Sequence, residues 1–287
     1  MTAVIQTPPT RLDVLRRLFR NRTVLIAALV LSVIALLAIF APLVAPYDPD
    51  ALSIVNRFQS PSLAHPFGTD EFGRDVLSRA IYAGRVSLLV SAAVVVFAGI
   101  AGVVMGILAG YFRRLDAVIS RFLDAMMAFP DILLAISLVA ALGGSLTNVI
   151  LALGITYTPR LARVVRGTTL VLRELPYIEA AKSMGVPTWR ILGGHVLVNL
   201  ASPILVQATF IFASAMLAEA SLSFLGVGAS PDVPTWGTML STGREYISSA
   251  PWLMYFPGLA IVFAVLSLQI LGDGLRDLVD PRLAKDL

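Results

Sequence analysis

Few side chains in this sequence belong to the types that catalyse reactions or bind metals. Cysteine is absent, and the two histidines, His65 and His195, lie far apart in the chain. Disulfides, thiolate chemistry and cysteine-ligated metals are therefore excluded, and a histidine-based zinc site is disfavoured. A metal site built from His65, Asp70 and Glu71 is conceivable, but these residues better fit a solvated turn that leads into an interfacial helix. We expect no metal site.

Motifs for nucleotide binding and hydrolysis are also missing. The chain has no G-x-x-x-x-G-K-[ST] loop to cradle the phosphates of ATP, no HExxH and no G-x-S-x-G. No nucleophile stands beside a plausible base, which argues against an intramembrane enzyme. We predict no catalytic residue and no cofactor bound by this chain.

Glu219 is the acidic residue nearest to the interior of an apolar segment. It fits a helix cap or an ion-pair partner; alternatively, it faces a water-filled path and contributes to gating. A proton-coupled carrier usually holds ionisable groups near mid-membrane, whereas those of this chain lie near the ends of apolar runs.

Composition places these side chains in an integral membrane protein. The chain is 57% hydrophobic and 14% charged, against about 25% charged residues in soluble domains, and its mean hydropathy is +0.83. A membrane-spanning helix needs ~20 apolar residues. Five uncharged runs are long enough: 23–47, 86–112, 132–159, 191–218 and 246–272. The first is too long for the apolar part of a signal peptide, about 7–15 residues, and predicts a retained anchor.

The run 132–159 is either one tilted span or parts of two spans that meet at "GGSLTN", residues 143–148. Gly-Gly followed by Ser and Asn is typical of a turn. With six spans and a cytoplasmic N-terminus, 17 of the Lys and Arg residues lie inside and 5 outside. With five spans the split becomes 9 inside and 13 outside, which inverts the positive-inside rule. We therefore predict six spans with both termini in the cytoplasm.

The predicted fold is all-α, a polytopic membrane helical bundle. Its spans are 23–46, 86–111, 122–142, 147–167, 200–222 and 251–272, within a single membrane domain of residues 23–287. Residues 1–22 form a basic cytoplasmic arm that orients the chain and touches anionic lipid. Segments 47–85 and 223–250 are external, and the loop 168–199 between spans four and five is cytoplasmic.

The second span carries Gly102, Gly106 and Gly110 at intervals of four. Such a ladder of small residues lets another helix approach closely. The ladder serves packing within the bundle or contact with a partner subunit; we favour internal packing.

The cytoplasmic loop contains "EAAKSMGVPTWRILGGHVLVN", residues 179–199. Glu179, Ala180 and Ala181 favour a helix, which Gly185 ends, and Pro187 suits the first turn of the next helix. The second helix then carries Trp189 and Arg190. We predict two short helices with a sharp corner, suited to docking in a cleft on another protein, and an interfacial role for His195.

Four stretches resemble one known family. "EAAKSMG" (179–185) with "HVLVN" (195–199) is similar to the EAA motif of bacterial ABC-importer permeases, although Val198 stands where that pattern has proline. "FGTDEFGRDVLSRAIYAGRVSL" (67–88), "AEASLSFLGVGASPDVPTWGTML" (218–240) and "LGDGLRDLVDPRL" (271–283) resemble the DppC/OppC branch of these permeases. The matches run in order over most of the chain.

The resemblance implies a transport subunit of the bacterial plasma (inner) membrane, without an ATP site of its own. Its implied partners are a second, DppB/OppB-like permease, two cytoplasmic ABC ATPases that hold ATP and Mg, an external substrate-binding protein and membrane lipid, but no nucleic acid. The EAA loop would form coupling helices that dock on an ATPase.

The resemblance leaves the substrate open. Short peptides are favoured, and nickel chelates, glutathione and opines are the alternatives within the family. A self-sufficient, ion-coupled secondary carrier is the alternative from another class.

Overall fold

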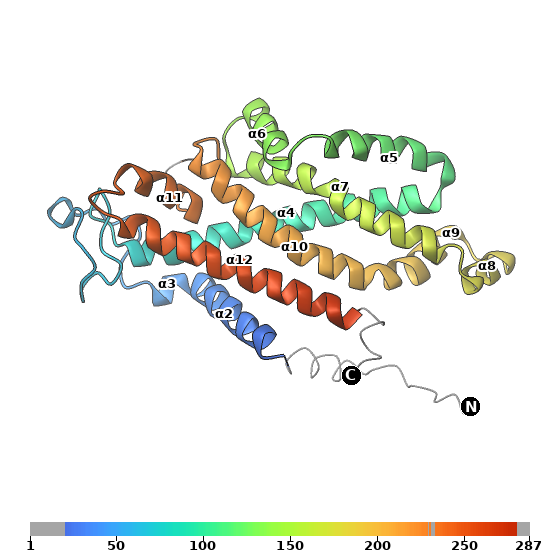
Figure 1. The fold of residues 1–287 in the computed structure, drawn as a ribbon, viewed down its shortest axis with the longest axis horizontal. Coiled ribbons are helices and arrows are strands. Elements are labelled where there is room, and N and C mark those ends of the chain that lie inside the picture. The colour runs from blue at the N-terminus through green and yellow to red at the C-terminus, as the bar shows by residue number, and fades with distance from the viewer. Residues whose placement is uncertain (1–20, 229, 231–232, 280–287) are drawn as a thin grey trace.

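The structure is a computed structural model that describes residues 21–228, 230 and 233–279 (Figure 1). Within these ranges every regular element is helical, apart from one isolated bridge between Thr69 and Asp75. Most of the predicted basic arm and residues 280–287 of the polar tail lie outside the described residues. The expected all-α fold is confirmed for the described part of the chain.

Long helices run side by side along the longest axis of the molecule (Figure 1). They are α2 (Arg22–Ile39), α4 (Val76–Tyr111), α7 (Leu146–Leu172), α10 (Leu197–Phe224) and α12 (Trp252–Val279). Shorter helices are α3 (Ala41–Val44), α5 (Arg113–Met127), α6 (Asp131–Leu142), α8 (Pro176–Ser183), α9 (Thr188–Ile191) and α11 (Trp236–Glu245). A 3₁₀ turn, Ile54–Asn56, lies in the long loop before α4, and a π-helical turn, Leu192–Val196, joins α9 to α10.

Four helical runs are long and apolar enough to cross a bilayer. They are α2, α4, the run Thr188–Phe224 and α12, and the bent pair of α5 and α6 makes a fifth when it is counted as one span. Helix α7 has the length of a span but carries Arg160, Arg163 and Arg166. The protein is thus a multi-pass membrane protein by the length and composition of its helices.

The third predicted span, 122–142, differs from the structure. Helix α5 ends at Met127 and α6 starts at Asp131, with a bend of 93° between them. Pro130 explains the break, because proline lacks the N–H that a helix interior needs and disfavours helical backbone in the residue before it. The break at "GGSLTN" agrees with the prediction: Gly143 has φ +93°, and the Ser145 hydroxyl accepts the Asn148 N–H at 3.2 Å.

Helix α4 starts earlier than the second predicted span, so residues 76–85 belong to a long helix. Its first turn is capped by Asp75, whose Oδ2 accepts the Ser78 N–H at 2.8 Å. Asp75 Oδ1 lies 2.9 Å from His65 Nδ1, which fixes the cap. A satisfied N-cap stabilises a helix by about 1 kcal/mol. Capping therefore extends α4 beyond its uncharged core.

The predicted external segment 223–250 contains α11, which is buried among its neighbours. The Trp236 side chain is inserted beside α4 and donates from Nε1 to the Ala80 carbonyl at 2.9 Å. Thr235 and Thr238 form a reciprocal capping box at the start of α11. This end of the bundle is consequently closed by a short helix packed on α4, α10 and α12.

Helix α4 packs against α7 through its glycine ladder. A Cβ at Gly102 would lie 2.9 Å from the Leu161 Cβ, one at Gly106 2.6 Å from the Ala162 carbonyl oxygen, and one at Gly110 2.6 Å from the Thr169 Cβ. The structure therefore places all three glycines at a close contact between two helices of the same chain.

Candidate functional site

The strongest candidate site is the corner formed by residues 176–191, which joins α8 to α9. Gly185 forms the turn with φ +76°, a left-handed conformation that L side chains rarely adopt. The Val186 N–H bonds to the Ala181 carbonyl at 3.1 Å, and the Gly185 N–H to Lys182 at 3.0 Å. These two bonds satisfy the last carbonyls of α8, as in other glycine-terminated helices.

The corner has one face on the bundle and one face in solvent. Ile178, Ala181 and Ile191 are buried and anchor the corner in the hydrophobic core. The other predicted coupling residues are exposed: Glu179, Ala180, Gly185, Pro187, Trp189 and Arg190. Ala181 is thus the exception among them, because it faces inward.

The exposed tip of the corner is apolar. Trp189 is 69% exposed and Met184 76%, and the Arg190 guanidinium lies 5.0 Å from the centre of the Trp189 ring. Exposed aromatic residues flanked by arginine are typical of protein–protein contacts. The tip has the chemistry of a docking surface.

The segment after the corner runs into α10 without interruption. His195 lies in the π-helical turn, its exposed ring 6.0 Å from that of Tyr177. Such turns often occur at functional positions in helices. Val198, where the family pattern has proline, keeps its backbone N–H, and the helix continues through it. The second helix of the corner and α10 therefore form one continuous helical run, Thr188–Phe224.

Two side chains contact the end of α4, one at the C-terminal end of α7 just before the corner and one on α8. Arg173 Nη1 donates to the Gly110 carbonyl at 2.8 Å, and the Lys182 ammonium lies 5.3 Å from the centre of the Tyr111 ring. A cation near the C-terminal carbonyls of a helix is stabilising. No local sequence pattern predicted these contacts, because their partners are about 60 residues or more apart.

Glu219 lies in a buried cluster of hydroxyl groups. Its Oε1 accepts from the Ser223 hydroxyl at 2.9 Å and its Oε2 from the Ser87 hydroxyl at 3.4 Å, while Ser87 accepts the Trp236 N–H at 3.2 Å. The carboxyl thus joins α10, α4 and the start of α11. No Lys or Arg of the described residues forms an ion pair with it, and its side chain is not exposed to a path in this structure.

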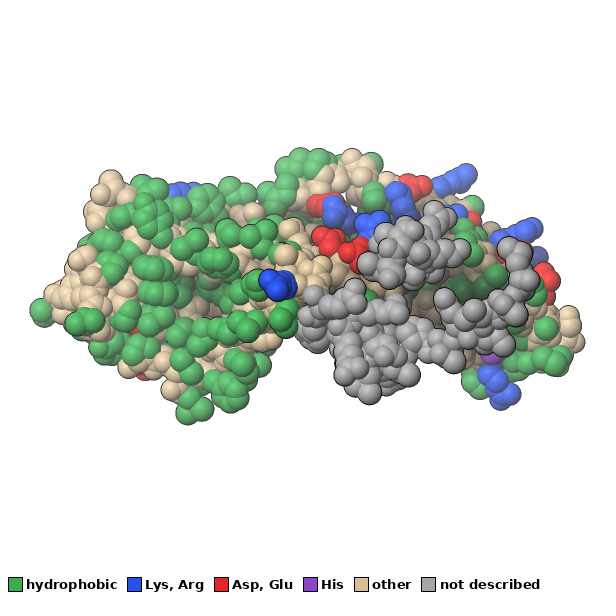
Figure 2. All heavy atoms as spheres, turned by 60° about the horizontal axis from the view of Figure 1, so that its bottom comes forward, with side chains coloured by type: hydrophobic (Ala, Val, Ile, Leu, Met, Phe, Trp, Pro, Cys, Tyr) green, Lys and Arg blue, Asp and Glu red, His purple; other side chains and the backbone are tan. Residues whose placement is uncertain are grey.

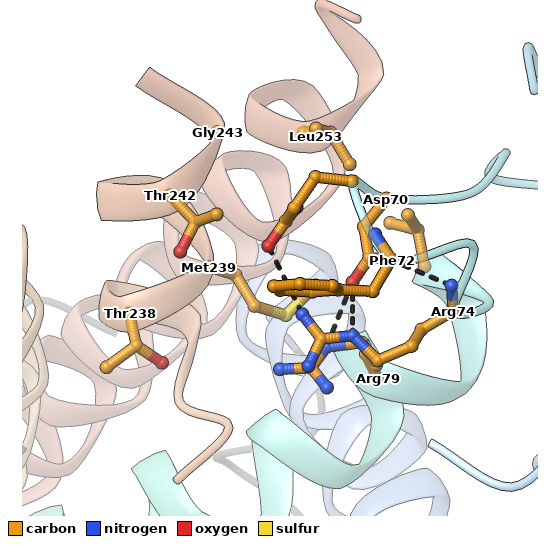
Figure 3. Close-up of a pocket in the computed structure, with 11 residues that line it drawn as sticks. Asp70, Phe72, Arg74, Arg79, Thr238, Met239, Thr242, Gly243 and Leu253 are labelled. Atoms are coloured by element: carbon orange, nitrogen blue, oxygen red, sulfur yellow. Dashed lines mark hydrogen bonds and ion pairs between the residues drawn. The ribbon is translucent and has the colours of Figure 1, made fainter. Parts of the chain in front are cut away.

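A pocket of about 230 Å³ lies between the loop before α4 and α11. Figure 3 shows Thr238, Met239 and Thr242 on one side and Asp70 and Arg74 on the other. Asp70 pairs with Arg74 at 2.6 Å. Burial raises the pKa of the Glu71 carboxyl, whose Oε2 has no hydrogen-bond partner among the described residues.

His65, Asp70 and Glu71 do not come together as metal ligands. His65 binds Asp75 instead, and Asp70 and Glu71 pair with Arg74. Among the described residues no group of three His, Cys, Asp or Glu side chains could hold a metal ion.

Comparison with known proteins decides what kind of protein presents this corner. Residues 102–285 match the family described as binding-protein-dependent transport system inner membrane component. The chain belongs to this family. Residues 11–61 also match the N-terminal TM domain of oligopeptide transport permease C. Together the two matches cover most of the chain, with residues 62–101 outside both, and they agree with the family that the sequence resembles.

Similar curated members of the transport family are permease proteins. The chain is 48% identical over 268 residues to a putative peptide transport system permease protein of Brucella abortus, covering 93% of this chain and 90% of the relative. It is 44% identical over 272 residues to the dipeptide transport system permease protein DppC of Alkalihalophilus pseudofirmus, covering 94% and 90%. It is 42% identical over 270 residues to the glutathione transport system permease protein GsiD of Pectobacterium atrosepticum, covering 93% and 90%.

A solved structure of the MetNI methionine ABC transporter, in an inward-facing conformation, has a similar fold. The TM-score is 0.59 at 20% sequence identity, over 71% of this chain and 98% of the MetNI chain. The common fold covers the greater part of this chain and nearly all of the MetNI chain.

Proposed function

We propose that this chain is one of two permease subunits of an ATP-driven importer for short peptides. The corner carries the proposal, because a membrane chain without an ATP-binding motif presents a rigid, exposed apolar edge there. The names of relatives at 40–48% identity, several of them peptide or dipeptide permeases, support the substrate class. The partners would be a second permease, two ATPases that bind ATP and Mg²⁺, and an external binding protein.

The proposed topology has six spans: α2, α4, the bent pair α5–α6, α7, α10 and α12. Counting α7 as a span places the corner and the N-terminus on the same, cytoplasmic side, in agreement with the positive-inside rule. The arginines of α7 then require a polar environment at membrane depth.

Under this proposal, movement of the corner is passed on to two helices, α10 and α4. ATP-driven closure of the docked ATPases displaces α8 and α9; the continuous run Thr188–Phe224 carries the displacement into α10. Lys182 of α8, together with Arg173 just before the corner, would carry the displacement into α4, which packs closely on α7. The spans would thereby rock between inward-open and outward-open states.

The energy source of uptake tests this proposal. Membrane vesicles that contain the complete transporter should take up radiolabelled dialanine only with ATP, and vanadate should abolish uptake. An ionophore that collapses ion gradients should leave it intact. Uptake that collapses with the ionophore and ignores vanadate would instead establish a secondary carrier.

A further inference from the structure

Helix α7 carries three arginines at intervals of three residues, and each pairs with an aspartate on α5 or α6. Arg160 pairs with Asp131. Arg163 Nη2 lies 2.6 Å from Asp124 Oδ1, and Arg166 binds Asp116 through Nε at 2.5 Å and Nη2 at 2.9 Å. We name these three pairs the ion-pair ladder.

The ladder lies at membrane depth in the proposed topology. A helix of 27 residues such as α7 is about 40 Å long at 1.5 Å per residue, against about 30 Å for the hydrocarbon core. Arg160 stands near the middle of α7. Its partner Asp131 stands at the first position of α6, directly after the 93° bend. Broken helices at this depth are typical of substrate sites in transporters.

The two pairs formed by Arg160 and Arg163 are only partly covered by the rest of the chain. The side chains of Arg160 and Asp131 are 46% and 35% exposed, and those of Arg163 and Asp124 54% and 63%. Charged groups at this depth avoid lipid tails and face water or polar partners. The exposed face of α7 continues from Arg163 to Gly167, where an added Cβ would have no neighbouring atom within 4 Å. This face is thus an open, charged strip.

Figure 2 shows the surface contrast on one side of the molecule. One half is largely hydrophobic, whereas positive and negative side chains gather over the other half, toward the end that bears α8 and α9.

We propose that the ion-pair ladder lines the translocation path and that Arg160 and Asp131 bind the charged ends of a peptide in transit. This inference rests on the proposed function. A short peptide carries a carboxylate and an ammonium group at neutral pH. Guanidinium binds carboxylate in a bidentate manner, and an aspartate accepts from ammonium. The peptide would replace each residue's present partner.

The position of Arg160 is defined by its aromatic neighbour. The guanidinium lies 5.7 Å from the centre of the Tyr157 ring, and the Tyr157 hydroxyl donates to the Ser214 carbonyl of α10 at 3.2 Å. The site is therefore coupled to α10, the helix that continues from the corner. Movement of the corner would alter the geometry at Arg160.

Thiol labelling tests whether the ladder faces water. The chain has no cysteine, so in each single variant only the introduced thiol of this chain can be labelled, and labelling is measured on this chain after the subunits are separated. In inside-out vesicles with the complete transporter, Arg160→Cys and Asp131→Cys should react with a membrane-impermeant cationic thiol reagent at least tenfold faster than Leu133→Cys. Leu133 is the matched control, since it is an exposed apolar residue on α6. Equal rates at all three positions would overturn the proposal.

Protection tests the ligand chemistry. Saturating dialanine should slow labelling of Gly167→Cys, whereas N-acetyl-dialanine amide, which lacks both charges, should not. Adding Arg160→Gln should remove the protection. Equal protection by the two compounds, or protection that survives Arg160→Gln, would contradict the assignment. Labelling needs no ATP, whereas the uptake assay depends on it. A failure of the binding site proposed here can therefore be distinguished from a failure of the proposed function.

Discussion

Replacing Gly185 with valine should lower ATP-driven uptake about tenfold while leaving the amount of protein in the membrane unchanged. A non-glycine residue in the left-handed region costs roughly 1–2 kcal/mol, and a factor of ten corresponds to 1.4 kcal/mol. No atom lies near the position of the added side chain, so the penalty comes from the backbone alone. It falls on the turn that sets the angle between α8 and α9. Uptake of dialanine and ATP hydrolysis by the complete transporter should both be measured, with hydrolysis continuing uncoupled from uptake.

Gly185→Asn is the matched control for the valine variant. Asparagine tolerates left-handed backbone far better than a β-branched residue does. It should therefore retain most of the uptake, although it is nearly the same size as valine. If both variants transport like the wild type, the shape of the corner does not couple ATP hydrolysis to transport.

Replacing Gly106 with leucine should prevent stable folding. Even the Cβ would lie 2.6 Å from the Ala162 carbonyl oxygen and 2.6 Å from the Val165 Cβ, so α4 and α7 would have to separate. Overpacking by a few methylene groups costs about 1–3 kcal/mol, and a backbone contact cannot move aside as a side chain does. Membrane levels of the protein and its melting temperature in detergent measure the effect.

The control for this substitution lies on the same helix. A Cβ at Gly99 would meet no atom within 4 Å. Gly99→Leu should therefore accumulate and melt like the wild type. Comparable losses at both positions would show that glycine matters for α4 itself and not for its contact with α7.

Local chemistry predicted the features of the site that depend on neighbouring residues. The turn at Gly143 and the corner at Gly185 follow from glycine, serine and proline placed a few residues apart. The break before Asp131 had an equally local cause in Pro130, but the predicted span 122–142 was drawn through it. Residues 76–85 were predicted as part of an external segment, in an interfacial helix separate from the second span, whereas they form the first turns of α4.

Contacts between distant segments could not be predicted from sequence patterns. The burial of Trp236 depends on Ala80 and Ser87 of α4. The pairing of the α7 arginines depends on a bend that brings α5 and α6 alongside α7. In the sequence, the arginines of α7 served only in the count of positive charges on each side of the membrane. The structure shows that they also pair with aspartates of α5 and α6 and that two of these pairs are partly exposed.

Cross-linking at the corner tests the central claim most directly. A Met184→Cys variant, in membranes that contain the complete transporter, should be joined by a short bismaleimide to a protein that carries the P-loop ATPase motif, identified by mass spectrometry. Leu63→Cys, an exposed position in the predicted external segment, should not be joined to it. An ATPase linked through Leu63 and not through Met184, or no ATPase linked at either position, would contradict the account.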